Sequence, residues 1–140
     1  MRTVSSSVAS LWALISLIVC ILIGVSGCGS ANFYPVKGKV IVYETGKYLT
    51  EGEVRFQPVS NSSLVATGKI KPNGTFSLET PGHGEGVLEG ACRGAVLVPP
   101  RNGQPVVAER YRDFDTSELR YTVTARSENY FIIEVRRGDK

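Results

Sequence analysis

The strongest constraint on the fold is the pattern of the chain after Pro35. Short runs rich in Val, Ile, Phe, Tyr and Thr alternate with clusters of Gly, Pro, Asn and Ser. Within the runs, apolar and polar residues alternate with a period of two, which is typical of half-buried strands. No window beyond Pro35 shows sustained helical periodicity. This part of the chain therefore predicts an all-β domain.

The runs with strand character place about seven strands in this domain. They cover residues 36–43, 53–58, 64–70, 75–79, 91–98, 121–125 and 130–135. Pro58 has no amide hydrogen to donate, so we expect it to end its strand. About seven short strands in roughly 100 residues favour a single β-sandwich with Greek-key connections.

Two pairs of these strands carry the turn signals of hairpins. Pro72-Asn73-Gly74 separates the third strand from the fourth, and Asn and Gly tolerate the positive φ of a tight turn. Ser127-Glu128-Asn129 is predicted to be the turn of a closing hairpin between the last two strands. Residues 81–90 are predicted to form a glycine-rich loop, and residues 101–118 a long polar connection.

A run of apolar residues precedes the domain. Leu11–Val25 carries no charge and follows Arg2. It is about 15 residues long, which is the size of a signal-peptide core and short for a membrane-spanning helix of about 20 residues. With Val8 and Ala9 included the run reaches about 18 residues, so a retained transmembrane anchor stays open as an alternative.

The four residues Val25-Ser26-Gly27-Cys28, at the end of this run, resemble the lipobox of bacterial lipoproteins. Small residues leave the backbone uncrowded for a membrane peptidase. The resemblance implies that the Cys28 thiol takes a diacylglycerol and that its freed amine takes a third acyl chain. One acyl chain holds a protein only marginally, whereas three make a lasting anchor. Gly29, in place of the Asp that retains many such lipoproteins at the inner membrane, favours the outer membrane.

These patterns divide the chain into four parts. We expect a lipoprotein signal peptide over residues 1–27, a lipidated tether over 28–34, the β-sandwich domain over 35–136 and a short tail over 137–140. The expected location is the bacterial cell envelope, with the membrane as a partner through the N-terminal lipid.

The cysteines and the net charge argue against an internal disulfide and against a nucleic-acid partner. Cys20 leaves with the signal peptide and Cys28 is acylated, so Cys92 remains alone and no internal disulfide can form. Cys92 lies in an apolar run, where a free cysteine is expected to be a buried, small hydrophobe. Loss of Arg2 lowers the net charge from +3 to +2, and the charges are intermixed, so we expect no nucleic-acid partner.

The order of glycines and core residues in the domain resembles the carboxypeptidase regulatory-like, transthyretin-like family. Its motifs correspond to "VKGKVIVYETGKYLTEGEVRFQP" and "ATGKIKPNGTFSLET", and later to "YRD" and "TSEL". The resemblance implies a prealbumin-like Greek-key sandwich and is specific for architecture, not for activity. The chain departs from the family in one strand, where Cys92 replaces an aromatic and Gly94 a bulky aliphatic residue.

The sequence offers few of the groups that catalysis or metal binding requires. The hydroxyisourate hydrolases, which share the transthyretin-like fold, need several histidines and a C-terminal Y-R-G-S, whereas this chain has only His83 and ends in "RRGDK". Zinc needs three or four ligands, and a calcium loop needs more clustered carboxylates than Glu85 and Glu89 provide. We therefore expect no enzymatic activity, no metal and no cofactor.

The best candidate for a binding surface lies in the long connection. Charged and aromatic side chains gather there, and loops of this kind often carry function. The candidate residues are Tyr111, Arg112, Asp113, Phe114 and Asp115. The simpler interpretation is that Tyr111 and Phe114 pack on the edge of the sandwich while the charges are solvated. A carbohydrate platform would use Tyr111, Phe114 or Tyr48.

Three classes of function remain open at this point. The leading one is a non-enzymatic binding or structural module of the envelope that meets another envelope protein or a polysaccharide. The alternatives are a minor hydrolase and a transport or folding accessory that binds small apolar groups. Open strand edges or an exposed apolar patch would favour a binding module, whereas titratable groups that converge on a pocket would favour an enzyme.

Overall fold

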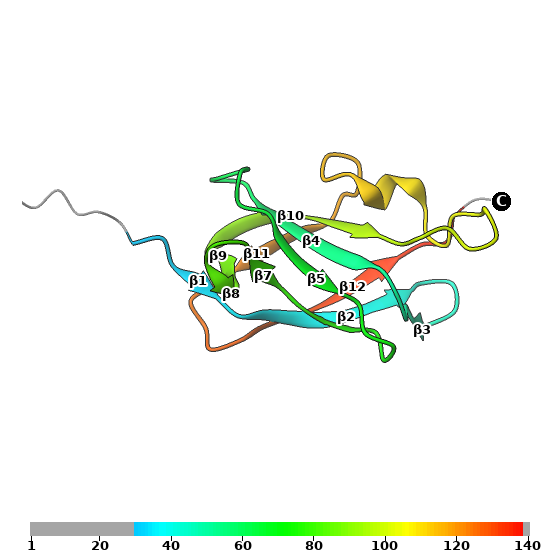
Figure 1. Cartoon of the computed structure of the whole chain (residues 1–140), viewed down its shortest axis with the longest axis horizontal. Coiled ribbons are helices and arrows are strands. Elements are labelled where there is room, and N and C mark those ends of the chain that lie inside the picture. The colour runs from blue at the N-terminus through cyan, green and yellow to red at the C-terminus, as the bar shows by residue number, and fades with distance from the viewer. Residues whose placement is uncertain (1–29, 139–140) are drawn as a thin grey trace, which may run out of the picture. The chain divides into compact units, whose positions relative to one another are not determined.

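The computed structural model describes residues 30–138, and these residues form an all-β domain (Figure 1). They contain twelve short β-strands and one short 3₁₀-helix, η1 (Glu109–Arg112). No helix in this part of the chain has the length and apolar character to cross a membrane. The predicted signal peptide and the predicted lipidation residue Cys28 lie outside the described residues.

One sheet is built around β2 (Val36–Val42). On one side β2 pairs in parallel with β12 (Asn129–Val135), and on the other it pairs antiparallel with β3 (Lys47–Tyr48) and β6 (Thr75–Ser77). Gly38 of β2 allows a close approach here, because a Cβ at this position would lie 2.0 Å from the backbone oxygen of Phe131. We call this unit the four-stranded sheet.

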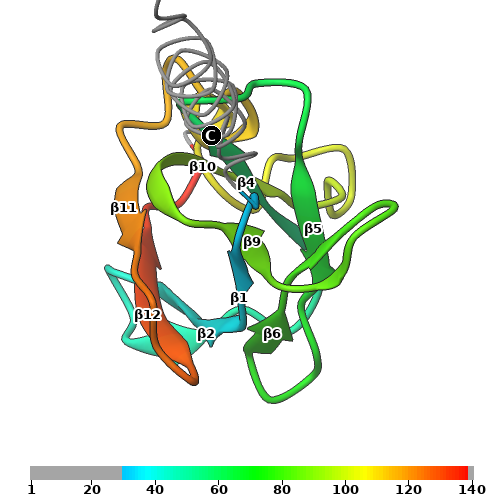
Figure 2. The same cartoon turned by 90° about the vertical axis from the view of Figure 1, so that its left-hand side faces the viewer.

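The second unit, the six-stranded sheet, is antiparallel throughout. Its strand order is β11 (Arg120–Val123), β10 (Gly90–Leu97), β4 (Glu53–Pro58), β5 (Ala66–Lys69), β7 (Glu79–Thr80) and β8 (Gly84–Glu85). A separate pair, β1 (Phe33–Tyr34) with β9 (Val87–Leu88), lies across one end of the sheets (Figure 2).

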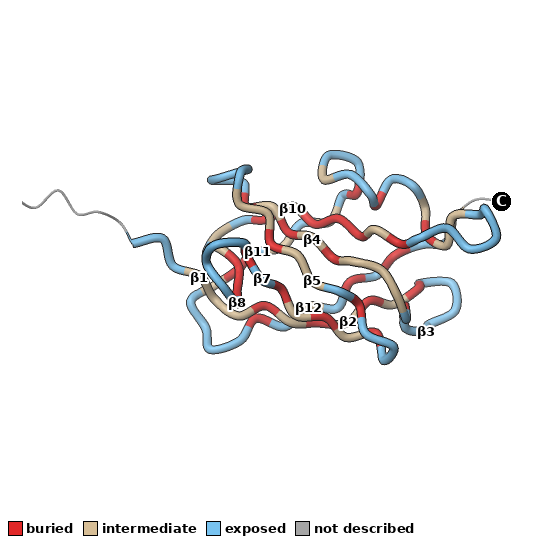
Figure 3. The backbone as a smooth tube through the Cα atoms, in the orientation of Figure 1, coloured by how far each residue is buried: buried red, intermediate tan, exposed pale blue. Residues whose placement is uncertain are grey.

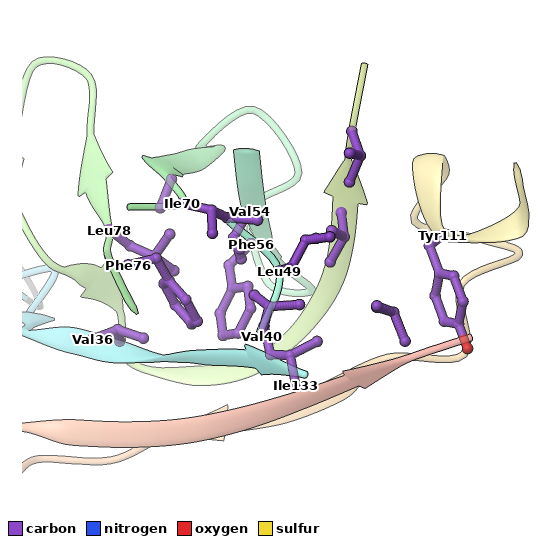
Figure 4. Close-up of a cluster of buried hydrophobic side chains, with 14 of the residues drawn as sticks. Val36, Val40, Leu49, Val54, Phe56, Ile70, Phe76, Leu78, Tyr111 and Ile133 are labelled. Atoms are coloured by element: carbon purple, nitrogen blue, oxygen red, sulfur yellow. The ribbon is translucent and has the colours of Figure 1, made fainter. Parts of the chain in front are cut away.

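The buried side chains of the two larger sheets form one hydrophobic core (Figures 3 and 4). Burial alternates along β2 and β4, as the period of two predicts. Val54 and Phe56 have no exposed surface, and Pro58 ends its strand as expected. The prediction of an all-β domain is confirmed, and the arrangement is consistent with a β-sandwich.

The predicted closing hairpin is wrong. β11 pairs with β10 in the six-stranded sheet, whereas β12 runs parallel to β2 in the other sheet. The Asn129 side chain fixes this crossing, because its amide donates to the backbone oxygens of Pro35 (3.4 Å) and Thr124 (3.0 Å) and its oxygen accepts the Thr124 N–H (3.0 Å). Ser127 and Glu128 therefore connect two sheets and not two paired strands.

The turn at Pro72-Asn73-Gly74 forms, but the strand that follows it is divided. Gly74 has a φ of +81°, and its N–H donates to the Lys71 oxygen at 2.8 Å. The predicted strand 75–79 is two strands, since β6 joins the four-stranded sheet and β7 joins the six-stranded sheet. The predicted hairpin with residues 64–70 is therefore wrong for β6, which pairs with β2, and only Glu79 of β7 pairs with β5, at Thr67. Phe76 and Leu78 are both buried, as predicted. The segment thus fills the core while it passes from one sheet to the other.

The domain begins earlier than the predicted boundary at Pro35. Phe33 and Tyr34, assigned above to the tether, pair with Leu88 and Val87 as β1 and β9. The predicted glycine-rich loop over 81–90 therefore contains strand structure. At the other end, Arg137 forms a backbone bridge with Val107, which attaches the first residue of the predicted tail to the domain.

Candidate binding surfaces

The predicted surface over residues 111–115 lies on η1 and the turn that follows it. Tyr111 is only 4% exposed, and its ring belongs to the hydrophobic core. Its hydroxyl accepts the Arg136 backbone N–H (3.2 Å) and an N–H of Arg110 (3.0 Å). Tyr111 therefore fastens η1 to the end of β12 and does not form a surface platform. Figure 4 shows the hydroxyl directed toward that strand.

The two aspartates hold the long connection in place. The Asp113 carboxylate accepts the backbone N–H of Asp115 at 2.7 Å, and the Asp115 carboxylate pairs with Arg93 of β10. Ser117 adds a hydrogen bond from its hydroxyl to the Gly94 oxygen at 2.6 Å. Asp113 thus stabilises the turn, while Asp115 and Ser117 attach it to β10.

Arg112 and Phe114 have different surroundings. Phe114 is half-buried, while Arg112 is exposed, with its Nε 3.7 Å from a carboxylate oxygen of Glu109. Arg112 also lines a hollow of about 420 Å³ on the outer face of the six-stranded sheet, together with Arg55 and Lys69. Of the five predicted residues, Arg112 is the one placed at this hollow.

The residues considered for catalysis or metal binding lie apart. His83 is exposed, and its ring stacks on Phe33 with 4.3 Å between ring centroids. Across residues 30–138, no group of three His, Cys, Asp or Glu side chains is arranged to hold a metal ion. Cys92 is buried, as predicted, and burial raises the pKa of its thiol to about 11. The thiol is therefore protonated at neutral pH.

Three exposed apolar side chains share the outer face of the four-stranded sheet. Tyr130 and Ile132 of β12 are 52% and 56% exposed, and Tyr48 of β3 is 48% exposed. Ile132 pairs with Lys39 in the register, and the Lys39 ammonium lies 4.8 Å from the centre of the Tyr48 ring. We call Tyr48, Tyr130, Ile132 and Lys39 the tyrosine face.

Sequence reasoning identified Tyr48 but missed Tyr130 and Ile132. Apolar residues occupy successive positions of β12, from Tyr130 to Ile133, so the pattern shows no polar side. Residues two apart in a strand lie on the same face of the sheet. Because Ile133 faces the core, Tyr130 and Ile132 lie on the opposite, solvent-exposed face.

A group of arginines lies where η1 meets the end of β12. Arg110, Arg136 and Arg137 line a hollow of about 550 Å³ with Glu44 and Ala108. The Arg136 guanidinium lies 4.8 Å from the centre of the Tyr43 ring, and Arg110 forms a 3.2 Å ion pair with Glu118. The predicted last strand ends at residue 135, so Arg136 is the last residue of the predicted domain and Arg137 the first of the predicted tail, and the sequence pattern gives neither a role.

Comparisons with protein-family models, curated proteins and solved structures returned no match. The surfaces of the domain and the N-terminal motif are therefore the observations that bear on function. The tyrosine face combines three apolar or aromatic side chains with Lys39, whereas the surface around Arg136 and Arg137 is polar and cationic.

Proposed function

We propose that this protein is a lipid-anchored, non-enzymatic binding module of the bacterial cell envelope. It would carry one transthyretin-like, carboxypeptidase regulatory-like Greek-key sandwich and present it to another envelope protein or to a polysaccharide. The glycine and core motifs from Gly38 to Leu78 support this family, and the all-β architecture is compatible with it. The lipobox at Val25–Cys28 supports the anchor.

The observation that carries the binding role is the tyrosine face. Tyrosine rings offer a rigid apolar surface with a polar tip, which suits contacts with sugars and with proteins. Here Tyr130 and Ile132 are more than half exposed on a regular strand, next to the cation of Lys39. Neighbouring exposed apolar side chains on an outer sheet face are typical of an interaction site.

The roles of the residues in the 101–118 connection favour a binding module over a hydrolase. The Tyr111 hydroxyl bonds the chain near the end of β12, and the Asp115 carboxylate pairs with Arg93. The carboxylate of Asp113 accepts a backbone N–H within the same turn. Each of these groups thus has a structural contact, which supports a binding module over a hydrolase.

The anchor would keep the domain close to the membrane. Five residue steps separate Cys28 from Phe33, where β1 begins. A fully extended chain of that length spans at most about 18 Å. An acylated Cys28 would therefore hold the β1 end of the domain near the lipid headgroups.

The anchor is tested by membrane fractionation and mass spectrometry of the full chain. We expect the mature protein to begin at an acylated Cys28 and Cys28→Ala to lose the mature lipid-anchored form. A Cys28→Ala protein that is processed and membrane-bound like the wild type, or an unmodified wild-type residue 28, would contradict the proposal.

The binding role is tested by affinity capture from the native envelope with the lipidated protein. We expect one polysaccharide or envelope protein to be captured by the wild type and lost with Ile132→Ser and Tyr130→Ser. Val59→Ser is the matched control, because Val59 is 60% exposed and lies outside the tyrosine face. Equal capture by all variants would show that the tyrosine face is not the binding surface.

A further inference from the structure

We infer that the arginine-lined end of the sandwich binds the carboxylate groups of an acidic polysaccharide. This site comprises Arg110, Arg136 and Arg137 with the adjoining Arg101 and Lys47, and we call it the arginine end. The inference rests on the proposed function as a binding module, to which it adds a ligand class and a second surface.

The three central arginines converge from two elements on one hollow of about 550 Å³. Arg110 belongs to η1, and Arg136 and Arg137 directly follow β12. Tyr111 joins these elements, because its hydroxyl accepts hydrogen bonds from the Arg110 side chain and from the Arg136 backbone. The buried Tyr111 thus ties the Arg110 side chain to the backbone from which Arg136 extends.

Two of these cations lack a balancing carboxylate. Arg110 forms an ion pair with Glu118, but Arg136 and Arg137 form none with any residue of 30–138. Glu44 also lines the hollow, and its carboxylate accepts the backbone N–H of Arg137 at 3.1 Å. Guanidinium groups present parallel N–H donors that match the two oxygens of a carboxylate. An anionic ligand would therefore find unpaired, suitably shaped donors here.

The arginine end continues beyond the first hollow. Arg137 also lines a hollow of about 500 Å³ with Arg101, Pro105 and Val106. It lines a third of about 220 Å³, where Arg101 recurs and Lys47 is added; Arg101 is itself ion-paired with Glu51. The cations are thus distributed over neighbouring hollows, as a ligand with repeated negative charges requires and a single small ion does not.

Apolar groups between the cations favour a sugar polymer. Pro105 and Val106 are half-buried, and Tyr43 is 59% exposed beneath the Arg136 guanidinium. Aromatic and aliphatic surfaces of this kind pack against the C–H faces of sugar rings while arginines bind the acidic groups. A uronic acid polymer supplies both features.

The location fits an anchored protein. Within the folded domain, β1 and the C-terminal end lie at opposite ends of the long dimension (Figure 1). An anchor at Cys28 would join the domain through its β1 end, so the arginine end is the part of the domain farthest from that attachment. Polysaccharide beyond the membrane surface would then be within reach.

The test uses the full chain purified in detergent and polygalacturonate as the probe. We expect saturable binding that weakens as salt is raised, because exposed charges are screened. Arg136→Gln/Arg137→Gln is expected to weaken binding about tenfold, while Arg126→Gln changes it by less than about twofold. Arg126 is a suitable control because it is exposed in the connection between β11 and β12. Equal thermal unfolding of the variants would show that folding is unchanged.

Three results would overturn the inference: no binding of polygalacturonate, equal weakening by Arg126→Gln, or binding to polyphosphate at least as tight as to polygalacturonate. Fully methyl-esterified polygalacturonate is the matched neutral polymer, and we expect it not to bind. If the inference fails while envelope capture through the tyrosine face persists, the proposed function stands without this ligand. If capture through the tyrosine face fails while polygalacturonate binds, the arginine end is the binding surface.

Discussion

The outer faces of the two larger sheets differ in what covers them. On the six-stranded sheet, the 101–118 connection lies against β10, held by the Arg93–Asp115 ion pair and the hydrogen bond from Ser117 to Gly94. On the four-stranded sheet, Tyr130 and Ile132 are more than half exposed to solvent. The outer side of β10 is thus covered by the connection, whereas the outer side of β12 is available for contacts.

Ala95 and Ile132 both lie on an outer sheet face but differ greatly in solvent exposure. Ala95 of β10 points outward, because its neighbours Gly94 and Val96 do not share its side of the sheet, yet it is only 1% exposed. Ile132 of β12 also points outward and is larger and more apolar, yet it is 56% exposed. Burial on an outer face therefore depends on the segment that covers the sheet and not on the residue type.

The largest expected effect is on the covering segment. Tyr111→Ala should destabilise the domain by about 3 kcal/mol, because it empties a buried aromatic site that fastens η1. Urea unfolding at pH 7 measures this loss. A loss in the free energy of unfolding below about 1 kcal/mol would show that the connection is loosely attached to the sheet. The two outer faces would then not differ in how firmly they are covered.

A smaller effect isolates the hydroxyl of the same residue. Tyr111→Phe keeps the ring but leaves the Arg136 N–H without its acceptor, so we expect a loss of about 1 kcal/mol. The comparison with Tyr111→Ala separates ring packing from hydrogen bonding. Hydrogen exchange should also quicken at the Arg136 amide, and unchanged exchange there would contradict this role for the hydroxyl.

Alkaline pH is expected to weaken the six-stranded sheet. Burial raises the pKa of Cys92 from 9.0 to about 11 and the pKa of Tyr121 from 10.0 to about 12. Between pH 9 and 12 the unfolded chain loses these protons first, so the folded state binds more protons and its stability falls as pH rises. Urea midpoints between pH 8 and 11 measure the fall.

The matched pair Cys92→Ala and Tyr121→Phe tests the source of this pH dependence. Each variant should have a shallower decline above pH 9 than the wild type, whatever its stability at pH 7. An unchanged slope in both variants would assign the alkaline effect to other groups.

The smallest expected effect is on the uncovered face. Tyr130→Ala should change the free energy of unfolding by less than about 0.5 kcal/mol, because the side chain is already half in solvent. The same variant should reduce capture of the envelope ligand. A stability loss close to that of Tyr111→Ala would mean that the two faces do not differ as proposed.

Local patterns were enough to predict most strands and their buried sides. Val54 and Phe56 alternate with polar neighbours, and Pro58 lacks the donor that a longer strand needs, so this strand was predicted with its correct end. Cys92 lies in an apolar run, and its burial followed from that environment. Such features depend on residues close in sequence, which is why the sequence reveals them.

The candidate surface was only partly predictable. Tyr111, Asp113 and Asp115 were correctly placed in a long connection, but the pattern could not show that they contact β10 and the end of β12. The partners Arg93 and Arg136 are 22 and 25 residues away from Asp115 and Tyr111. Contacts at that separation depend on how the sheets pack.

By itself, the sequence determined the all-β character, the buried side of the main strands, the burial of Cys92 and the lipobox-like N-terminal motif. Tertiary structure alone decided that β12 runs beside β2 and that Arg110, Arg136 and Arg137 line one hollow. The reason is that strand alternation specifies which side chains avoid water, whereas strand pairing is chosen by long-range hydrogen bonds such as those of Asn129.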